Sequence, residues 1–311
     1  MSRIHEALKK AAAERNAHEA ERSVSELVDL TKKEESAKND TFLPTQPVLP
    51  KFPIDQKFTQ FEEFAQHCRK VDLRMDSSTS VFSMQLEHQS GAEKFRTLRS
   101  RLYQIASAQP LKRILVTSST PAEGKTFVVA NLAQSFIRQT DRRVLLIDSD
   151  LRASRLHLHF GAQETPGLSD YLKGACGESQ ITQMGMNGNL CLIPGGSDAS
   201  NPSELLHSDR MKQLLDRMSL LFDWIILDSP PALAVHDSSI LADMCDGVLF
   251  VVRAGSTDFQ LAEKASAEFR EKNLLGVVLN RVEKHDAYGE YYYGYESEPK
   301  GETDAQSSEK P

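Results

Sequence analysis

The chain has 311 residues, of which 40% are hydrophobic, with a net charge of −7 and four cysteines. This length allows one or two folded domains, and the acidic balance argues against a general nucleic-acid binder, which would carry a basic face. No apolar run reaches the roughly 18 residues of a membrane-spanning helix, the N-terminus lacks a signal-peptide core, and the cysteines show neither metal-binding nor disulfide spacing. We therefore expect a cytoplasmic protein.

Residues 1–85 predict an amphipathic helix followed by a largely disordered linker. Apolar residues recur at helical spacing near the start, at Ile4, Ala7, Leu8 and Ala11. A helix this short is marginal by itself, so it is either a frayed terminus or a docking helix for a partner or a membrane surface. Residues 20–58 are polar and proline-bearing, which favours disorder. A helical patch of three phenylalanines at residues 58–68 has the composition to pack on the domain that follows.

Residues 89–107 predict a helix with Ser90 as its N-cap and Glu93 completing a capping box. Glu93, Arg96 and Arg99 fall within about a third of the helix circumference at 3.6 residues per turn. They form either weak ion pairs on a solvated face or charge pairs across the subunits of a homo-oligomer.

Residues 113–126 predict a strand, a loop of small residues and the start of a helix. Gly-Lys-Thr in this context is typical of a phosphate-binding loop, in which backbone N–H groups and the helix N-terminus face the phosphates. Lys125 would reach the β- and γ-phosphates, and the Thr126 hydroxyl would ligate Mg²⁺. Ser119 stands where the motif has its first glycine, so a turn that contains Gly-Lys-Thr by chance is the alternative. The predicted nucleotide-binding residues are Ser119, Thr120, Pro121, Ala122, Glu123, Gly124, Lys125 and Thr126.

A continuous apolar run at residues 144–147 predicts a buried parallel strand that ends in Asp148 and Asp150, with Arg152 two residues further on. Ligands of open parallel sheets bind outside the carboxyl ends of the strands. Both aspartates would therefore lie beside the phosphate loop. One aspartate at a strand end is often only a helix cap, whereas two followed by an arginine favour Mg²⁺ binding and catalysis.

The remaining pattern alternates strands and helices. A helix is expected from residue 201 to about 221, and the buried run at 224–227 ends in Asp228, which can hold Mg²⁺ directly or through a water. Other strands are expected at residues 190–193, 247–252 and 274–279. This order predicts an α/β fold, a doubly wound and mostly parallel sheet with helices on both faces.

Residues 284–311 form an acidic tail that carries five of the seven tyrosines: Tyr288, Tyr291, Tyr292, Tyr293 and Tyr295. Aromatic runs are more often core or stacking platforms. Here the composition favours disorder, and nucleic-acid stacking would want arginine or lysine neighbours. We expect a flexible substrate segment that enters the active site of an adjacent subunit.

Together these motifs resemble the cytoplasmic kinase domain of the bacterial tyrosine kinases (BY-kinases) of polysaccharide-export systems. The resemblance covers about residues 85–295 and rests on the loop 121–126, on 148–152 (Asp-Ser-Asp-Leu-Arg) and on 228–231 (Asp-Ser-Pro-Pro). Ala122 departs from it, because the family usually has glycine there. Glu93, Arg96 and Arg99 look like the family's E-x-x-R-x-x-R subunit-contact motif. The resemblance implies a kinase domain at residues 86–283 with a P-loop NTPase fold of the deviant Walker type.

The resemblance also implies an ATP- and Mg²⁺-dependent autokinase that phosphorylates the tail tyrosines in trans. Lys125 would stabilise the transferring group, while Thr126 with Asp148 or Asp228 would position Mg²⁺. A tyrosine with a pKa of about 10 needs a proton acceptor at neutral pH. Asp150 is the expected base and Asp148 its rival. Arg152 would either stabilise developing charge or brace the aspartates.

Implied partners are other copies of the chain in a ring, a cognate tyrosine phosphatase and a separate transmembrane polysaccharide chain-length protein. The last would activate the kinase and recruit it to the inner face of the membrane, where it would regulate capsular or exopolysaccharide synthesis and export. The alternative is a ParA/MinD-like ATPase switch that positions or times polysaccharide assembly without phosphorylating tyrosine. Such switches resemble one another in a signature lysine just upstream in the loop, where this chain has Thr120, and this difference favours the kinase.

Overall fold

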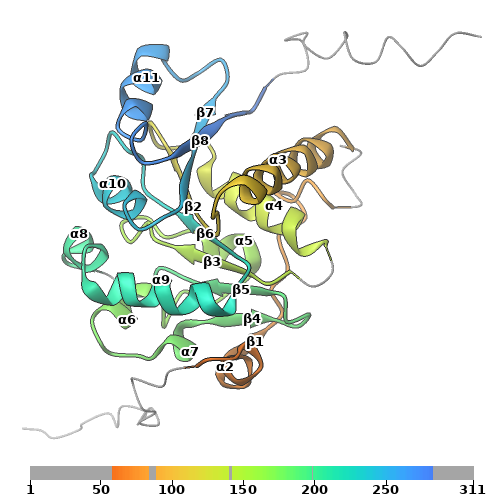
Figure 1. The fold of residues 1–311 in the computed structure, drawn as a ribbon, viewed down its shortest axis with the longest axis vertical. Helices are drawn as coiled ribbons and strands as arrows, with labels where there is room; N and C mark the ends of the chain where they lie inside the picture. Colours follow the sequence, from red (N-terminus) through yellow and green to blue (C-terminus); the bar gives the residue numbers. More distant parts are fainter. Residues whose placement is uncertain (1–57, 84–88, 140–141, 198, 283–311) are drawn as a thin grey trace, which may run out of the picture. The chain divides into compact units, whose positions relative to one another are not determined.

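The structure is a computed structural model that describes residues 58–83, 89–139, 142–197 and 199–282 (Figure 1). The described residues form one sheet with the strand order β1-β4-β5-β3-β6-β2-β7-β8. Neighbouring strands are parallel except for the antiparallel pair β4 and β5. The predicted N-terminal helix, most of the predicted linker and the tyrosine-rich tail lie outside the described residues.

The strands are short, and the described part of the chain also contains ten helices. The strands are β1 (Arg69–Val71), β2 (Arg113–Ser118), β3 (Val144–Asp148), β4 (Gln183–Gly185), β5 (Leu190–Ile193), β6 (Trp224–Asp228), β7 (Gly247–Arg253) and β8 (Leu274–Asn280). The helices are α2 (Phe61–His67), α3 (Gln89–Ala108), α4 (Lys125–Ile137), α5 (Leu156–Phe160), α6 (Leu168–Leu172), α7 (Glu178–Ile181), α8 (Pro202–Leu206), α9 (Asp209–Leu221), α10 (Asp237–Ala242) and α11 (Phe259–Ala267). Among them, no helix combines the length and the apolar character required to cross a membrane.

The sheet separates two hydrophobic clusters, because successive side chains of a strand point to opposite faces. Leu115 and Leu145 belong to the cluster covered by α2, α6 and α9. Ile114 and Leu146, their neighbours in sequence, belong to the cluster covered by α3, α4 and α5. Figure 1 shows α3 and α4 on one side of the sheet and α9 and α10 on the other. The predicted doubly wound α/β fold with a mostly parallel sheet is confirmed.

Strand β6 lies between β3 and β2, and this order brings the predicted site residues together. The Cα atoms of Asp148 on β3 and Asp228 on β6 are register partners, and Asp228 is also the partner of Val116 on β2. Because parallel strands end at the same edge of a sheet, both aspartates lie next to the loop that follows β2.

The ordered fold begins earlier than the domain boundary expected at residue 86. Phe64 on α2 is fully buried, and its ring packs edge-to-face on Phe222, with 6.1 Å between the centroids. Strand β1 then joins the edge of the sheet beside β4. The sequence predicts neither β1 nor β4, because a strand of three residues is too short to show the alternating pattern of a strand.

The single helix expected from residue 201 to 221 is two helices. Pro202 opens α8, as suits a residue with no N–H to donate. The backbone then leaves helical geometry at Ser208, whose hydroxyl accepts a hydrogen bond from the Met211 N–H and caps α9. At α3 the helix already includes Ser90, so it begins one residue before the predicted N-cap.

We predict that Phe64→Ala lowers the free energy of unfolding by about 3–5 kcal/mol, because it leaves a cavity in the core beneath α2. Phe259→Ala is the matched control, since the Phe259 side chain is 77% exposed and its loss should change stability by less than about 0.5 kcal/mol. Urea unfolding of both variants measures the difference. Equal values for the two variants would show that α2 is not part of the cooperative fold.

Candidate active site

The loop between β2 and α4 has the backbone of a phosphate cradle. Gly124, the residue before α4, has a φ of 96°. A Cβ atom at this position would lie 2.1 Å from Asn280 Nδ2, so both the backbone angle and the space require glycine. Ala122 also has a positive φ, of 65°, at the position where the family usually has glycine. Such a conformation costs a residue with a Cβ about 1–2 kcal/mol, so the rest of the loop must hold it.

Two of the predicted nucleotide-binding side chains point into the protein instead. Glu123 is buried, and its carboxyl group accepts hydrogen bonds from the Ser119 hydroxyl at 3.0 Å and from the Thr120 N–H at 2.7 Å. Ser119 is also buried, which explains why a serine stands at the place of the first glycine. Ser119 and Glu123 would therefore contribute to a phosphate site by fixing the backbone of the loop, not through their side chains.

Lys125, the first residue of α4, forms an ion pair with Asp150, with 3.3 Å between Nζ and Oδ2. Both side chains are largely buried, with exposed fractions of 14% and 6%. The other oxygen of Asp150 accepts a hydrogen bond from the Ala153 N–H at 3.1 Å. Two residues predicted to act in catalysis, from segments that follow different strands, are thus in direct contact.

Asp148 is fully buried and makes the contacts of a helix cap. Its Oδ2 atom accepts hydrogen bonds from the Ser154 hydroxyl at 2.7 Å, from the Arg155 N–H at 3.0 Å and from the Leu156 N–H at 2.9 Å, at the start of α5. Burial raises the pKa of Asp148 to about 6, and the hydrogen bonds from Leu156 and Ser154 oppose this rise. In this structure, Asp148 therefore acts as a helix cap, the alternative that the sequence left open for such an aspartate. Asp150 instead pairs with Lys125.

Asp228 is the side chain best placed to take a cation. It is buried, and its Oδ1 atom has no hydrogen-bond partner among the described residues. Burial raises the pKa of Asp228 to about 8, while Lys125 and a hydrogen bond with the Thr126 side chain lower it. A buried carboxylate oxygen without a partner is costly unless it is protonated or meets a cation.

These residues fit Mg²⁺ bound together with a nucleotide. Within the described ranges, no group of three or more His, Cys, Asp or Glu side chains is arranged to hold a metal ion. Mg²⁺ is usually held by one or two carboxylates, by waters and by phosphate oxygens. The hydroxyl of Thr126 and the unpartnered oxygen of Asp228 supply such an incomplete set.

Arg152 braces neither Asp148 nor Asp150 by a direct contact. Its guanidinium donates to Asp237 Oδ2 at 2.8 Å and to the Ser203 hydroxyl at 2.9 Å, and these hydrogen bonds with Asp237 raise its pKa. Asp237 is fully buried at the start of α10. Asp237 and Asp150 both raise the pKa of Arg152, with Asp237 the larger influence.

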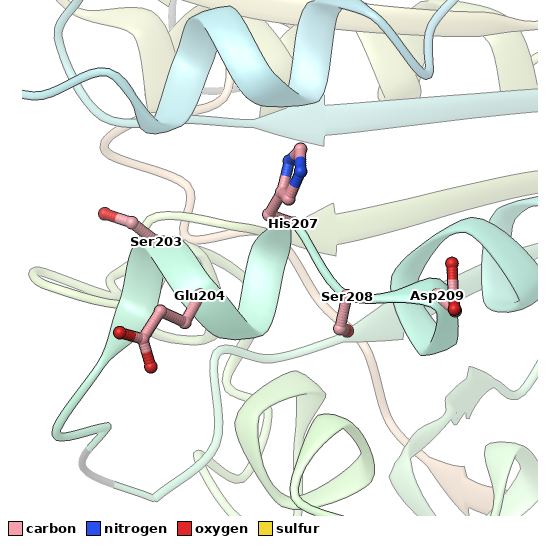
Figure 2. A pocket seen from close by; sticks show the side chains of 5 residues that line it. All are labelled: Ser203, Glu204, His207, Ser208 and Asp209. Carbon is pink, nitrogen blue, oxygen red and sulfur yellow. The ribbon is translucent and has the colours of Figure 1, made fainter.

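An open surface hollow of about 590 Å³ lies beside this cluster (Figure 2). It is lined by residues of α8 and the start of α9: Ser203, Glu204, His207, Ser208 and Asp209. Figure 2 shows these side chains on α8 and at the turn into α9. The lining includes no residue of the phosphate loop, and Ser203 connects the hollow to Arg152.

The three residues of the predicted subunit contact have different environments. Glu93 and Arg96 are exposed and form an ion pair with each other on α3. Arg99 instead donates to the backbone carbonyl of Ser135 on α4 and is only half-exposed. Within one chain, Glu93 and Arg96 therefore form a weak ion pair on a solvated helix face, which was one of the two alternatives. Both side chains remain accessible to a second subunit.

Residues that sequence reasoning missed also shape the site. Asn280 ends β8 and donates to the Glu123 carbonyl oxygen at 2.9 Å. It follows an apolar run, which is the same signal that identified Asp148 and Asp228. Asp237 and Thr257 lie in turns or at helix starts, where the sequence carries no comparable signal.

Comparison with known proteins agrees with this geometry. The family described as the CobQ/CobB/MinD/ParA nucleotide binding domain matches residues 114–303. The tyrosine-protein kinase YwqD of Bacillus subtilis is 35% identical over 219 residues, which are 69% of this chain and 91% of YwqD. The tyrosine-protein kinase wzc of Salmonella typhimurium is 36% identical over 214 residues, which are 67% of this chain but 30% of wzc.

Solved structures give the same result. The kinase domain of the Escherichia coli tyrosine kinase ETK matches with a TM-score of 0.60 and 34% identity, over 64% of this chain and 78% of that domain. The chimerical protein CapA2B2 matches with a TM-score of 0.62 and 26% identity, over 72% of this chain and all of the other. The fold and the site define a nucleotide-binding P-loop domain. The chain belongs to the bacterial tyrosine kinase family.

The raised pKa of Asp228 predicts how Asp228→Asn changes stability. The folded protein retains a proton that the unfolded chain has lost above about pH 4, so stability from this group falls as the pH rises towards 8. The variant should therefore melt at a higher temperature than the wild type without nucleotide, by a margin that grows from about pH 5 to about pH 8 and then levels off. Addition of Mg²⁺-ATP should reverse the order, because the wild type binds it more tightly.

The matched control for this experiment is Asp243→Asn, whose carboxylate is 65% exposed and pairs with Lys272. Its melting temperature should follow that of the wild type in parallel across the pH range. Parallel curves for Asp228→Asn as well would contradict the assignment of a buried, proton-holding carboxyl group.

Proposed function

We propose that the chain is an ATP-dependent protein-tyrosine autokinase that phosphorylates its own C-terminal tyrosines in trans. The observation that carries this proposal is the pairing of Lys125 with Asp150 beside the phosphate loop. It places a cation for the transferring phosphoryl group next to a carboxylate that can accept the proton of an incoming hydroxyl. The family membership supports the same chemistry.

In this proposal the loop residues 119–126 bind the phosphates through their backbone N–H groups and the N-terminus of α4. When bound, Mg²⁺ would neutralise phosphate charge, with Thr126 and Asp228 as its protein ligands and Asp148 as a further candidate. Lys125 would leave Asp150 for the phosphate oxygens, where a positive charge stabilises the transferring group.

Asp150 is the preferred base because its rival is already engaged. Oδ2 of Asp148 accepts three hydrogen bonds and is therefore occupied by backbone and side-chain donors at the start of α5, although burial raises the pKa of Asp148 to about 6. Once Lys125 turns to the phosphates, Oδ2 of Asp150 has no other partner among the described residues. Arg152 would serve as a fixed positive charge near the acceptor hydroxyl, with its orientation held by Asp237.

The proposed substrate is the cluster Tyr288, Tyr291, Tyr292, Tyr293 and Tyr295. Each phosphate would add about −1.5 to −2 charges to a tail that is already acidic. The repulsion would favour release of the tail and loosening of a homo-oligomeric ring. The proposed setting is capsular or exopolysaccharide synthesis at the inner face of a membrane, with a cognate phosphatase as antagonist.

A separate membrane protein that activates the kinase completes the proposal. Its support is that several kinase relatives are much longer than the matched region, as wzc is, of which this chain covers 30%. An alternative in this fold family is a ParA/MinD-like ATPase switch that hydrolyses ATP and leaves tyrosine unmodified.

We predict that Lys125→Met lowers the rate of tail phosphorylation at least about 100-fold, because the charge that stabilises the transferring group is lost. The measurement is phosphotyrosine mass spectrometry after incubation with Mg²⁺-ATP. Lys212→Met on the exposed face of α9 is the control and should phosphorylate at the wild-type rate. Hydrolysis of ATP by the wild type with no phosphotyrosine would favour the ATPase switch, and neither activity would favour an inactive scaffold.

The subunit contact leads to a separate prediction about assembly. Glu93→Lys should dissociate the oligomer, since it places like charges opposite each other wherever Glu93 meets an arginine of a neighbouring subunit. Light scattering with size-exclusion chromatography measures the mass. Lys94→Glu, an exposed charge reversal at the next position of α3, should leave the mass unchanged. If both variants kept the wild-type mass, the proposed role of this motif would be lost.

A further inference from the structure

We propose that Glu123 is a positioning residue for the nucleotide and that Thr257, outside the phosphate loop, holds it in place. The inference rests on the proposed ATP site, and it concerns residues that do not contact the nucleotide themselves. It explains why a carboxylic acid is buried in a loop that would otherwise bind negatively charged phosphates.

The first observation is the environment of the Glu123 carboxyl group. Its side chain is 2% exposed, and no ion pair within the described ranges includes it. Its oxygens accept hydrogen bonds from the Ser119 hydroxyl, the Thr120 N–H and the Thr257 hydroxyl. A buried carboxyl group with so many donors and no cation is held in place by those donors. It is therefore unsuited to act as a base or as a ligand.

The second observation is where Thr257 comes from. It lies in the turn between β7 and α11, 134 residues away from Glu123 in sequence. Its hydroxyl accepts a hydrogen bond from the Arg253 N–H at 3.2 Å, and its own N–H donates to the Arg253 carbonyl at 3.1 Å. Arg253 is the last residue of β7, which pairs with β2 in the sheet. Thr257 thus fixes Glu123 to the end of the neighbouring strand.

A second link holds the same residue through its backbone. Asn280, at the end of β8, donates to the Glu123 carbonyl oxygen at 2.9 Å. Glu123 therefore has one contact from the end of β7 and another from the end of β8. The residues on either side of it, Ala122 and Gly124, both have a positive φ.

These links determine the direction of the loop N–H groups before a nucleotide arrives. The left-handed conformation of Ala122 is unfavourable for a residue with a Cβ, so the loop would relax if Glu123 were released. A relaxed loop must be ordered when the nucleotide binds, and that ordering weakens affinity. Loss of the Thr257 hydroxyl should therefore weaken nucleotide binding, although the hydroxyl lies outside the loop.

The test compares Thr257→Val, which removes the hydroxyl at nearly constant shape, with Thr257→Ser, which retains it. The dissociation constant of a fluorescent ATP analogue with Mg²⁺ is measured for both, together with KM and kcat for phosphorylation. Thr257→Val should weaken affinity about 5- to 10-fold, as expected for the loss of a hydrogen bond to a carboxylate, and should raise KM more than it lowers kcat. Thr257→Ser should remain within about twofold of the wild type.

A matched control and a double variant separate positioning from general stability. Thr182→Val also removes a buried hydroxyl, one that donates to the Glu178 carbonyl oxygen at 2.8 Å. Thr182 precedes β4, which β5, β3 and β6 separate from β2 in the sheet. This variant should leave affinity unchanged. Glu123→Ala removes the carboxyl group and should weaken binding at least as much as Thr257→Val. The double variant should be no weaker than Glu123→Ala, because the Thr257 hydroxyl then has no carboxylate left to hold.

The outcomes are distinct. Wild-type affinity in Thr257→Val, or an equal loss in Thr182→Val, overturns the inference and leaves the proposed function intact. Strictly additive losses in the double variant also overturn it, because the two side chains would then act separately. A wild-type protein that bound no ATP analogue would overturn the proposed function and this inference together.

Discussion

The site depends on the pairing of β6 with β3 on one side and with β2 on the other. This arrangement ends three parallel strands at one edge and brings Asp148, Asp150 and Asp228 close together, with Lys125 paired to Asp150. Three carboxyl groups and one ammonium group leave an excess of negative charge in a buried setting. Burial raises the pKa of Asp148 and of Asp228, and the neighbouring carboxylates raise both further. A site of this kind suits a divalent cation bound together with a polyphosphate, as proposed above.

The aspartates differ because their neighbours differ, although all three follow buried strands. The start of α5 supplies Asp148 with three donors, so this carboxylate organises the backbone after β3. Asp150 meets Lys125, and Asp228 keeps an oxygen without a partner. Under the proposed mechanism, structure, proton transfer and cation binding would thus fall to three chemically identical side chains, and the donors around each one would decide its role.

The phosphate loop shows how departures from a glycine-rich motif are compensated. Ser119 replaces a glycine and uses its hydroxyl to hold Glu123. Ala122 takes a conformation that glycine would adopt without strain, and it precedes Glu123, which Thr257 and Asn280 both hold. Contacts from the ends of β7 and β8 therefore hold the loop in a conformation that a loop richer in glycine would adopt without them. The loop and the ends of β7 and β8 behave as one unit for this reason.

The sequence by itself determined the fold class, the strands that carry the site and the family, because apolar runs that end in aspartate and a Gly-Lys-Thr helix start are local patterns. It did not reveal β1, β4 or the break at Ser208, since short elements are defined by neighbours that lie far away in sequence. It also could not assign Arg152 to Asp237 or Glu123 to Thr257. Such contacts depend on which strand ends meet at one edge of the sheet, and strand order is a property of the tertiary structure alone.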